Sequence, residues 1–229
     1  MRKDVRPSIV PLLHSLDGER ALIKHVPFHS DACAVTFIEL LDALALQARC
    51  SQWVEKTPNH LLYMPEIEAC APDARFIHVI RPGADVLASL ADAYLRFEND
   101  DAFGGGSVHW ARRWNRAMQI HETCIGRTHH AFVFLEDLIR EPDDEWTRIC
   151  RFLGLRPDIR LEGACSQTIA DLEHEPWKRS AISGLPQPMR TKTDGLFTAK
   201  FQLWLGDHLE SYDKLRTKCL LLRNGAAAA

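Results

Sequence analysis

The sequence predicts an α/β fold built on a short parallel sheet. Two short apolar runs rich in β-branched or aromatic residues, 75–80 and 131–135, are typical of buried strands. Breaker residues flank the first run, with Pro72-Asp73 before it and Pro82-Gly83 after it. Beyond that breaker, apolar side chains recur at helical spacing, namely Val86, Leu90, Ala93 and Phe97. Strands that alternate with helices in this way favour parallel pairing.

Length and composition limit the classes of protein that fit. The 229 residues suit a single domain, and a net charge of −3 argues against a nucleic-acid partner. The chain has no run of eighteen apolar residues, and its broken N-terminal segment does not predict a signal peptide, so we expect no membrane partner. Seven cysteines without a CxxC pair indicate free thiols and a cytoplasmic setting. We expect no metal site, because His129-His130 lacks a second cluster at ligand spacing.

The N-terminal third is predicted to lead into a turn rich in polar residues. Residues 1–35 form an irregular segment in which 22–26 is a candidate strand, and a helix is expected from Thr36 to Ala48. Residues 51–54 are a second candidate strand. The turn 55–60 then leads into a helix that carries Leu61, Leu62 and Ile67.

An anion site is predicted where the strand at 75–80 ends. Arg81 leaves the carboxyl end of this strand, and Ser89 lies one to two turns along the helix that follows. Ligands of open α/β sheets bind outside the carboxyl ends of the strands, near helix N-termini. A guanidinium group there can bind phosphate through two hydrogen bonds, and a serine hydroxyl can add a donor.

The second half of the chain alternates loops and amphipathic helices. The glycine-rich stretch 98–107 is expected to be a loop, and Ser107 to cap a helix with Trp110, Trp114, Ala117 and His121 on one face. After the strand at 131–135, Glu136 and Asp137 are expected to brace neighbouring loops. A helix from Asp143 to Leu153 should end at Gly154.

The last part of the chain is predicted to combine a basic irregular region with a final helix. Residues 156–197 are irregular and carry patches of basic residues, which suggest a lid-like region. Thr198 should open a final helix with Phe201, Trp204, Leu205, Leu209 and Tyr212 on its apolar face.

The order and spacing of these segments resemble the sulfotransferase family, in particular its bacterial branch. The resemblance covers about residues 36–156 and rests on five stretches, each weak when taken alone. They are Glu55-Lys56-Thr57-Pro58 with His60, Pro72 to His78, Arg81 eight residues before Ser89, Phe134 to Leu138, and Phe152 to Leu155. The family implies a P-loop-NTPase-like three-layer sandwich over residues 1–229, and the donor 3′-phosphoadenosine 5′-phosphosulfate (PAPS). The expected reaction transfers a sulfuryl group to a hydroxyl or amine of a small metabolite or sugar.

The resemblance assigns roles to individual residues. Lys56 would stabilise charge on the bridging oxygen, and His60 would act as general base, with Glu55 as the alternative. Arg81 and Ser89 would hold the 3′-phosphate of the donor. A late basic loop would add further contacts to the donor from Lys178, Arg179, Arg190 and Lys192. Phe97, Phe103 and Trp110 would line the acceptor pocket.

Two departures from the family pattern keep a second hypothesis open. No loop of the form P-R-S-G-T precedes Trp53, and Leu135 stands where the family usually has tyrosine. A non-catalytic module that binds 3′,5′-bisphosphate or a partner protein is therefore the alternative to an enzyme. A phosphoryl-transfer enzyme is disfavoured, because no Walker lysine follows the glycines at 104–106. The expected partners are a small-molecule acceptor and, as one option, a second copy of the chain.

Overall fold

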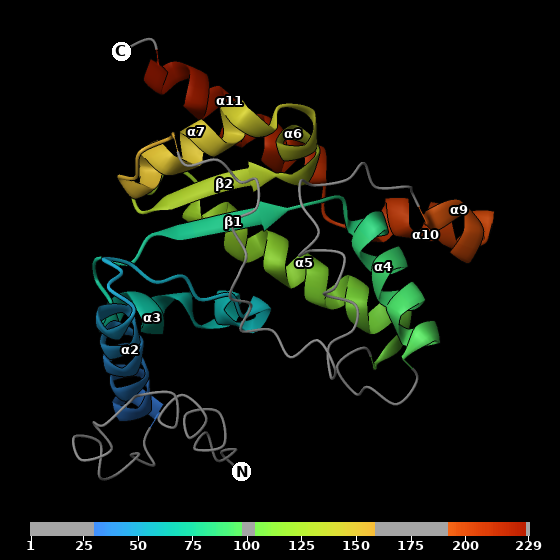
Figure 1. Cartoon of the computed structure of the whole chain (residues 1–229). Coiled ribbons are helices and arrows are strands. Elements are labelled where there is room, and N and C mark those ends of the chain that lie inside the picture. The colour runs from blue at the N-terminus through green and yellow to red at the C-terminus, as the bar shows by residue number, and fades with distance from the viewer. Residues whose placement is uncertain (1–29, 98–103, 159–191, 228–229) are drawn as a thin grey trace. The chain divides into compact units, whose positions relative to one another are not determined.

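The computed structural model of the chain describes residues 30–97, 104–158 and 192–227 (Figure 1). The chain divides into two compact units, an N-terminal unit, Met1–Ala74, and a C-terminal unit, Arg75–Ala229. The predicted strand at 22–26 and most of the predicted lid-like region lie outside the described residues. Within the described residues, no helix combines the length and the apolar character needed to cross a bilayer.

The N-terminal unit contains a long helix followed by an extended segment. Helix α2, Ser30–Gln47, begins earlier than the predicted start at Thr36, which lies buried inside it. Arg49 follows with a positive φ of 55° and helps to end the helical path. The predicted strand at 51–54 is wrong, because this segment is not a strand and pairs with none of the described strands, and Val54 is 89% exposed. The Trp53 indole N–H instead donates to the Asp42 carboxylate on α2 at 2.7 Å.

Two short helical elements replace the single helix predicted after the 55–60 turn. A 3₁₀ helix, η1, spans Pro58–Tyr63, and α3 spans Met64–Cys70. Each has a proline in its first turn, where the missing N–H costs no intrahelical hydrogen bond. The break lies at Tyr63, whose φ of −123° and ψ of 23° depart from helical values, and Pro65 has no N–H with which to continue a helical hydrogen-bond ladder across it.

The C-terminal unit is built around two parallel strands. Strands β1, Phe76–Ile80, and β2, His130–Phe134, pair from Phe76↔His130 to Ile80↔Phe134. Both lie within one residue of the predicted runs, so the predicted α/β class with a short parallel sheet is confirmed. Every residue of β2 is buried, whereas β1 alternates between buried and exposed positions. The carboxyl ends of the two strands therefore meet at one edge of the sheet.

Helices cover both faces of this sheet. Helix α5, Gly106–Cys124, lies on one side of the sheet, and α6, Leu135–Arg140, and α7, Pro142–Leu153, lie on the other (Figure 1). Gly154 ends α7 with a φ of 72°, as predicted. Helix α4, Gly83–Arg96, follows β1. A Cβ atom at Gly83 would lie 2.9 Å from both Trp114 and Leu209, so only glycine allows this close approach.

The apolar face of α5 is confirmed as part of the core. Trp110, Trp114, Met118 and His121 are buried, whereas Arg112 is exposed. The predicted cap is wrong, because the N-cap position is Gly105, with a φ of 102°, and Ser107 lies inside the helix.

The final helix is divided in two. Thr198 caps α10, Ala199–His208, by accepting a hydrogen bond from the Phe201 N–H at 3.3 Å, as predicted. A short helix, α9, Thr193–Leu196, precedes it. The predicted apolar face reached Leu209 and Tyr212, but α10 ends at Leu209 and a separate helix, α11, spans Tyr212–Ala227.

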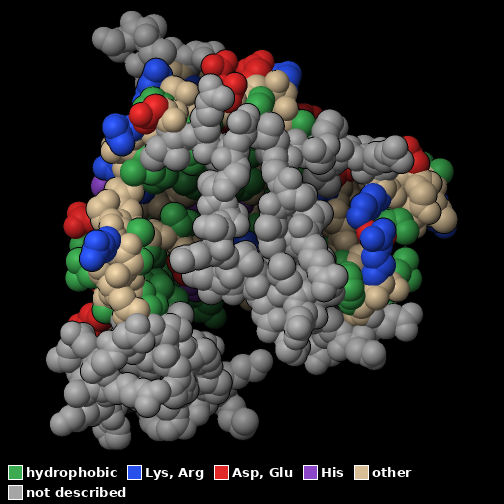
Figure 2. Space-filling view, in the orientation of Figure 1, with side chains coloured by type: hydrophobic (Ala, Val, Ile, Leu, Met, Phe, Trp, Pro, Cys, Tyr) green, Lys and Arg blue, Asp and Glu red, His purple; other side chains and the backbone are tan. Residues whose placement is uncertain are grey.

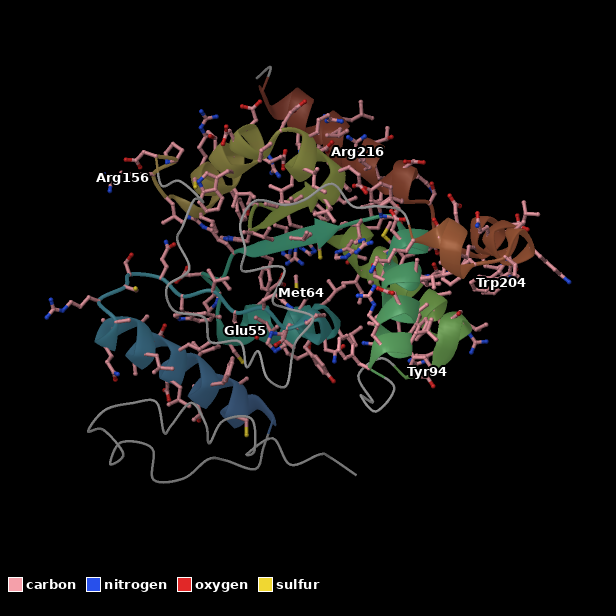
Figure 3. All side chains as sticks on the ribbon, turned by 45° about the vertical axis from the view of Figure 1, so that its right-hand side comes forward. Glu55, Met64, Tyr94, Arg156, Trp204 and Arg216 are labelled. Carbon is pink, nitrogen blue, oxygen red and sulfur yellow. The ribbon has the colours of Figure 1, made fainter. Side chains whose placement is uncertain are left out.

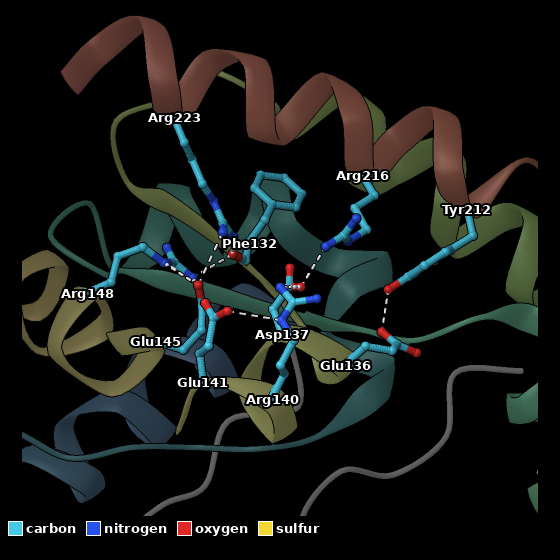
Figure 4. A network of polar contacts seen from close by, with 10 residues as sticks. All are labelled: Phe132, Glu136, Asp137, Arg140, Glu141, Glu145, Arg148, Tyr212, Arg216 and Arg223. Atoms are coloured by element: carbon cyan, nitrogen blue, oxygen red, sulfur yellow. Dashed lines mark hydrogen bonds and ion pairs between the residues drawn. The ribbon is translucent and has the colours of Figure 1, made fainter. Parts of the chain in front are cut away.

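Polar contacts tie α11 to the segment that follows β2 (Figure 4). The Tyr212 hydroxyl donates to Glu136 at 2.5 Å. Asp137 is only 4% exposed and accepts hydrogen bonds from Arg140 at 2.8 Å and from Arg216 at 2.6 Å. Glu136 and Asp137 therefore brace neighbouring elements, as predicted.

A second buried carboxylate, on α7, repeats this arrangement. Glu145 pairs with Arg148 at 2.6 Å and with Arg223 of α11 at 3.3 Å. Both arginines also donate to the carbonyl oxygen of Phe132 in β2. In Figure 2, acidic and basic side chains lie among one another along the upper edge of the molecule, over α6, α7 and α11. Charge pairing thus supplements apolar packing in holding α11 in place.

Asp137→Ala should lower the free energy of unfolding by about 2–3 kcal/mol, because Arg216 loses a partner in a partly buried site. Urea denaturation followed by circular dichroism measures this change. Asp143→Ala, at an exposed carboxylate in the first turn of α7, is the matched control and should cost less than about 1 kcal/mol. Equal losses in the two variants would contradict a structural role for Asp137.

Candidate functional site

Arg81 and Ser89, which are both predicted to hold an anion, lie in contact in the structure. Arg81 follows the last residue of β1, and its Nη2 donates to the Ser89 hydroxyl at 3.2 Å. The same nitrogen donates to the backbone carbonyl oxygen of Asp85 at 2.9 Å. The guanidinium group of Arg81 therefore lies along the first two turns of α4. It contacts one backbone carbonyl oxygen and one side-chain hydroxyl of that helix.

The Arg81 guanidinium is incompletely satisfied. Within the part of the chain that the structure describes, its buried Nε has no hydrogen-bond partner. Burial lowers the pKa of Arg81, although the carboxylates of Asp85 and Glu136 act in the opposite direction. A buried donor without a partner costs about 1–3 kcal/mol. An anion that accepted this hydrogen bond would remove the cost and would add a charge-assisted contact.

The acidic neighbours of Arg81 shape the same site. Burial raises the pKa of Asp85, and the nearby Glu136 carboxylate raises it further, while Arg81 lowers it. Glu136 also accepts the hydrogen bond from Tyr212, which together with burial raises the pKa of that phenol. These carboxylates hold the cationic side chain in position, but they also compete with any anionic ligand for its charge.

The basic residues predicted near the end of the chain have different outcomes. Lys178, Arg179 and Arg190 lie outside the described residues. Lys192 lies beside α4, where its ammonium group forms an ion pair with Asp92, one turn beyond Ser89. This contact is the main cause of the lowered pKa of Asp92. In this arrangement Lys192 is bound to a carboxylate, and its role in donor binding stays a prediction.

The turn in the N-terminal unit brings two of its three predicted residues together. The His60 Nδ1 lies 2.6 Å from the Glu55 carboxylate, which also accepts a hydrogen bond from the Thr57 hydroxyl at 2.6 Å. Lys56, between these residues in the sequence, is exposed. A carboxylate at Nδ1 fixes the tautomer that carries its proton there and leaves the Nε2 lone pair available as a base.

The predicted acceptor residues are only partly described. Phe97 is half-buried at the C-cap of α4, and Phe103 lies outside the described residues. Trp110 is 5% exposed, donates its indole N–H to the Gly104 carbonyl oxygen at 3.0 Å and forms a T-shaped contact with Tyr94. Figure 3 labels Tyr94 on α4. These contacts make Trp110 a core residue, and its contact with an acceptor stays a prediction.

A cavity of about 480 Å³ lies at the N-terminus of α4. Its walls include Gly83, Trp114, Gln202, Tyr212 and Asp213, which come from four segments of the C-terminal unit. No local pattern in the sequence predicted it, because residues separated by more than a hundred positions form its lining. Its size is in the range of small-molecule sites.

Comparison with protein families identifies the family to which these strands, turns and charged side chains belong. A family model described as "Sulfotransferase family" matches residues 16–158. The chain belongs to the sulfotransferase family. The resemblance over residues 36–156 is therefore confirmed, and the matched range contains both the Glu55–His60 turn and the Arg81–Ser89 pair.

Comparison with solved structures and curated proteins finds only low similarity for this sulfotransferase family member. The chain is similar to a structure described as "Sulfotransferase Domain from the Curacin Biosynthetic Pathway", with 18% sequence identity and a TM-score of 0.45. That match covers 87% of this chain and 78% of the other. A search of curated proteins finds no match.

We expect 3′-phosphoadenosine 5′-phosphate to raise the melting temperature of the protein, because its 3′-phosphate would satisfy the Arg81 guanidinium. Arg81→Met should weaken binding by about 10- to 100-fold and should remove most of this shift. Differential scanning fluorimetry checks both statements. Arg96→Met changes an exposed arginine at the C-terminal end of α4, the helix that Arg81 precedes, and should keep the shift. A full shift in Arg81→Met would show that Arg81 does not contact the ligand.

Proposed function

We propose that this sulfotransferase family member transfers the sulfuryl group of PAPS to a hydroxyl or amine of a small metabolite or sugar. The observation that carries the proposal is the Arg81–Ser89 contact at the carboxyl end of β1, with a buried guanidinium N–H that has no partner among the described residues. A 3′-phosphate provides oxygens for both side chains, and it distinguishes PAPS from nucleotides that lack this group. The free thiols of Cys124, Cys150 and Cys219 support a reducing cytoplasmic setting.

The proposed reaction is an in-line displacement at sulfur. The acceptor hydroxyl or amine loses its proton to the Nε2 of His60, whose Nδ1 faces Glu55. The acceptor oxygen or nitrogen forms a bond to sulfur while the bond from sulfur to the phosphate oxygen breaks. Negative charge grows on the leaving oxygen of 3′-phosphoadenosine 5′-phosphate, and the Lys56 ammonium group stabilises it.

The contact between Glu55 and His60 supports a division of roles between the two candidate bases. A carboxylate that accepts from the imidazole Nδ1–H orients the ring and stabilises the imidazolium formed after proton transfer. His60 then acts as the base, and Glu55 acts through it as a positioning residue. Both side chains are partly exposed, which suits a base that must meet an acceptor arriving from solvent.

Lys56→Ala should lower turnover by about 10²- to 10³-fold, because one stabilising contact to the leaving oxygen is lost. The assay measures release of 3′-phosphoadenosine 5′-phosphate from PAPS in the presence of a panel of phenols, amino sugars and alcohols. Lys200→Ala, an exposed lysine of α10, is the control and should retain full turnover. Circular dichroism should give the same spectrum for all three proteins.

Two outcomes would count against the proposed reaction. Full turnover in Lys56→Ala would contradict the role of that lysine. Binding of 3′-phosphoadenosine 5′-phosphate without turnover of any acceptor would favour a non-catalytic module instead, the reading supported by the absence of a P-R-S-G-T loop before Trp53.

A further inference from the structure

Three buried histidines meet in the core of the C-terminal unit. His78 on β1, His121 on α5 and His130 on β2 are each at most 9% exposed. The His78 Nδ1 lies 2.8 Å from the His121 Nδ1, and the His78 Nε2 lies 2.9 Å from the His130 Nδ1. Both ring nitrogens of His78 therefore face another imidazole. The proposed transfer reaction uses none of these side chains.

Aromatic packing holds these rings in fixed planes. Phe132 stacks on His78 with ring centroids 4.6 Å apart, and Phe76 stacks on His130 at 4.9 Å. The faces of the two imidazoles are thus covered by apolar rings, while their nitrogen-bearing edges point toward other polar atoms. Because the two rings are already fixed, they lose little further conformational entropy when a ligand binds.

The contacts among the three rings decide which nitrogen of His78 can bind a metal ion. A neutral imidazole has one donor and one acceptor nitrogen. If the His78 Nδ1–H donates to the His121 Nδ1, the His78 Nε2 has its lone pair free on the side that faces His130.

A cysteine adds a sulfur atom to this cluster. Cys124 is the last residue of α5, one turn after His121, and is 1% exposed. One ligand atom each from His78, His130 and Cys124 lies within 4.8 Å of the other two. Ligand atoms around a tetrahedral zinc ion are roughly 3.3–3.6 Å apart, given metal–nitrogen distances of about 2.0–2.1 Å and metal–sulfur distances of about 2.3 Å. Small side-chain rotations therefore convert the cluster into a coordination site.

We propose that His78, His130 and Cys124 bind a divalent metal ion of the zinc class inside the C-terminal unit. Two imidazole nitrogens and one sulfur form a donor set that suits zinc or cobalt, and disfavours magnesium and calcium, which prefer oxygen ligands. On binding, the Cys124 thiol loses its proton to solvent and the resulting thiolate bonds to the metal. The ion joins β1, β2 and α5 at a point where Figure 1 shows the sheet lying over that helix.

His121 has a separate, positioning role in this proposal. In the proposed tautomer, the His121 Nδ1, 2.8 Å from the His78 Nδ1, accepts the proton-bearing edge of His78, and the Nε2 of His78 then faces the ion. Histidine ligands commonly donate their second N–H to such a partner, and loss of that partner typically lowers metal affinity by about 10- to 100-fold.

Cobalt provides the direct test, because its spectrum reports on its ligands. The full-length protein is first stripped with a chelator and then titrated with cobalt(II) chloride. We expect one equivalent to bind, to produce a thiolate-to-cobalt charge-transfer band, and to raise the melting temperature. His121→Gln should keep the band but lower the affinity by about 10-fold or more.

Two pairs of variants locate the site. Cys124→Ser should abolish the charge-transfer band, whereas Cys150→Ser, at an equally buried cysteine of α7, should keep it. His130→Gln should weaken cobalt binding, whereas His129→Gln, at the exposed neighbouring histidine, should not. The wild-type spectrum decides the question even where a variant fails to fold. No cobalt uptake, or a bound ion without a thiolate band, would overturn the proposal and leave the cluster a metal-free chain of hydrogen-bonded histidines.

Discussion

The parallel pairing of β1 with β2 is the interaction on which the rest of the C-terminal unit depends. Its register places Ile80 opposite Phe134, so the chain leaves both strands at one edge of the sheet. Arg81 and the acidic residue Glu136 consequently come close enough to interact electrostatically. The same register brings His78 and His130, separated by 52 positions in the sequence, into contact at the other end of the pairing. One strand pair therefore positions both the side chains proposed to bind an anion and the buried histidines.

For Arg81, stability favours a fully hydrogen-bonded guanidinium, whereas the proposed ligand binding needs a donor that is left without a partner. A folded protein gains stability by satisfying buried donors, yet the Nε of this side chain is buried without a partner among the described residues. The cost persists because the Asp85 carbonyl oxygen and the Ser89 hydroxyl hold the guanidinium through its Nη2 atom. Such unsatisfied groups are typical of binding sites, where the ligand supplies the missing acceptor. Glu136 is in turn held by Tyr212, so α11 contributes to the site although it contains no predicted ligand contact.

The sequence predicted the parts of this structure that depend on local patterns. Apolar spacing, breaker residues and a family resemblance predicted both strands, the helix after Gly83, the end of α7 at Gly154 and the proximity of Arg81 to Ser89. The strand predicted at 51–54 is absent because a strand also needs a partner, which no local pattern guarantees. The cavity beside Gly83 and the cluster of His78, Cys124 and His130 depend on contacts between distant segments. Only the three-dimensional register brings those residues together.

The most direct test of this account compares the affinity of the protein for two nucleotides that differ only in the 3′-phosphate. Isothermal titration calorimetry with 3′-phosphoadenosine 5′-phosphate and with adenosine 5′-monophosphate isolates the group assigned to Arg81 and Ser89. The account predicts that the 3′-phosphorylated ligand binds at least about tenfold more tightly, as expected for one or more charge-assisted hydrogen bonds. Equal affinities would contradict an anion site at the end of β1, and with it the assignment of PAPS as donor.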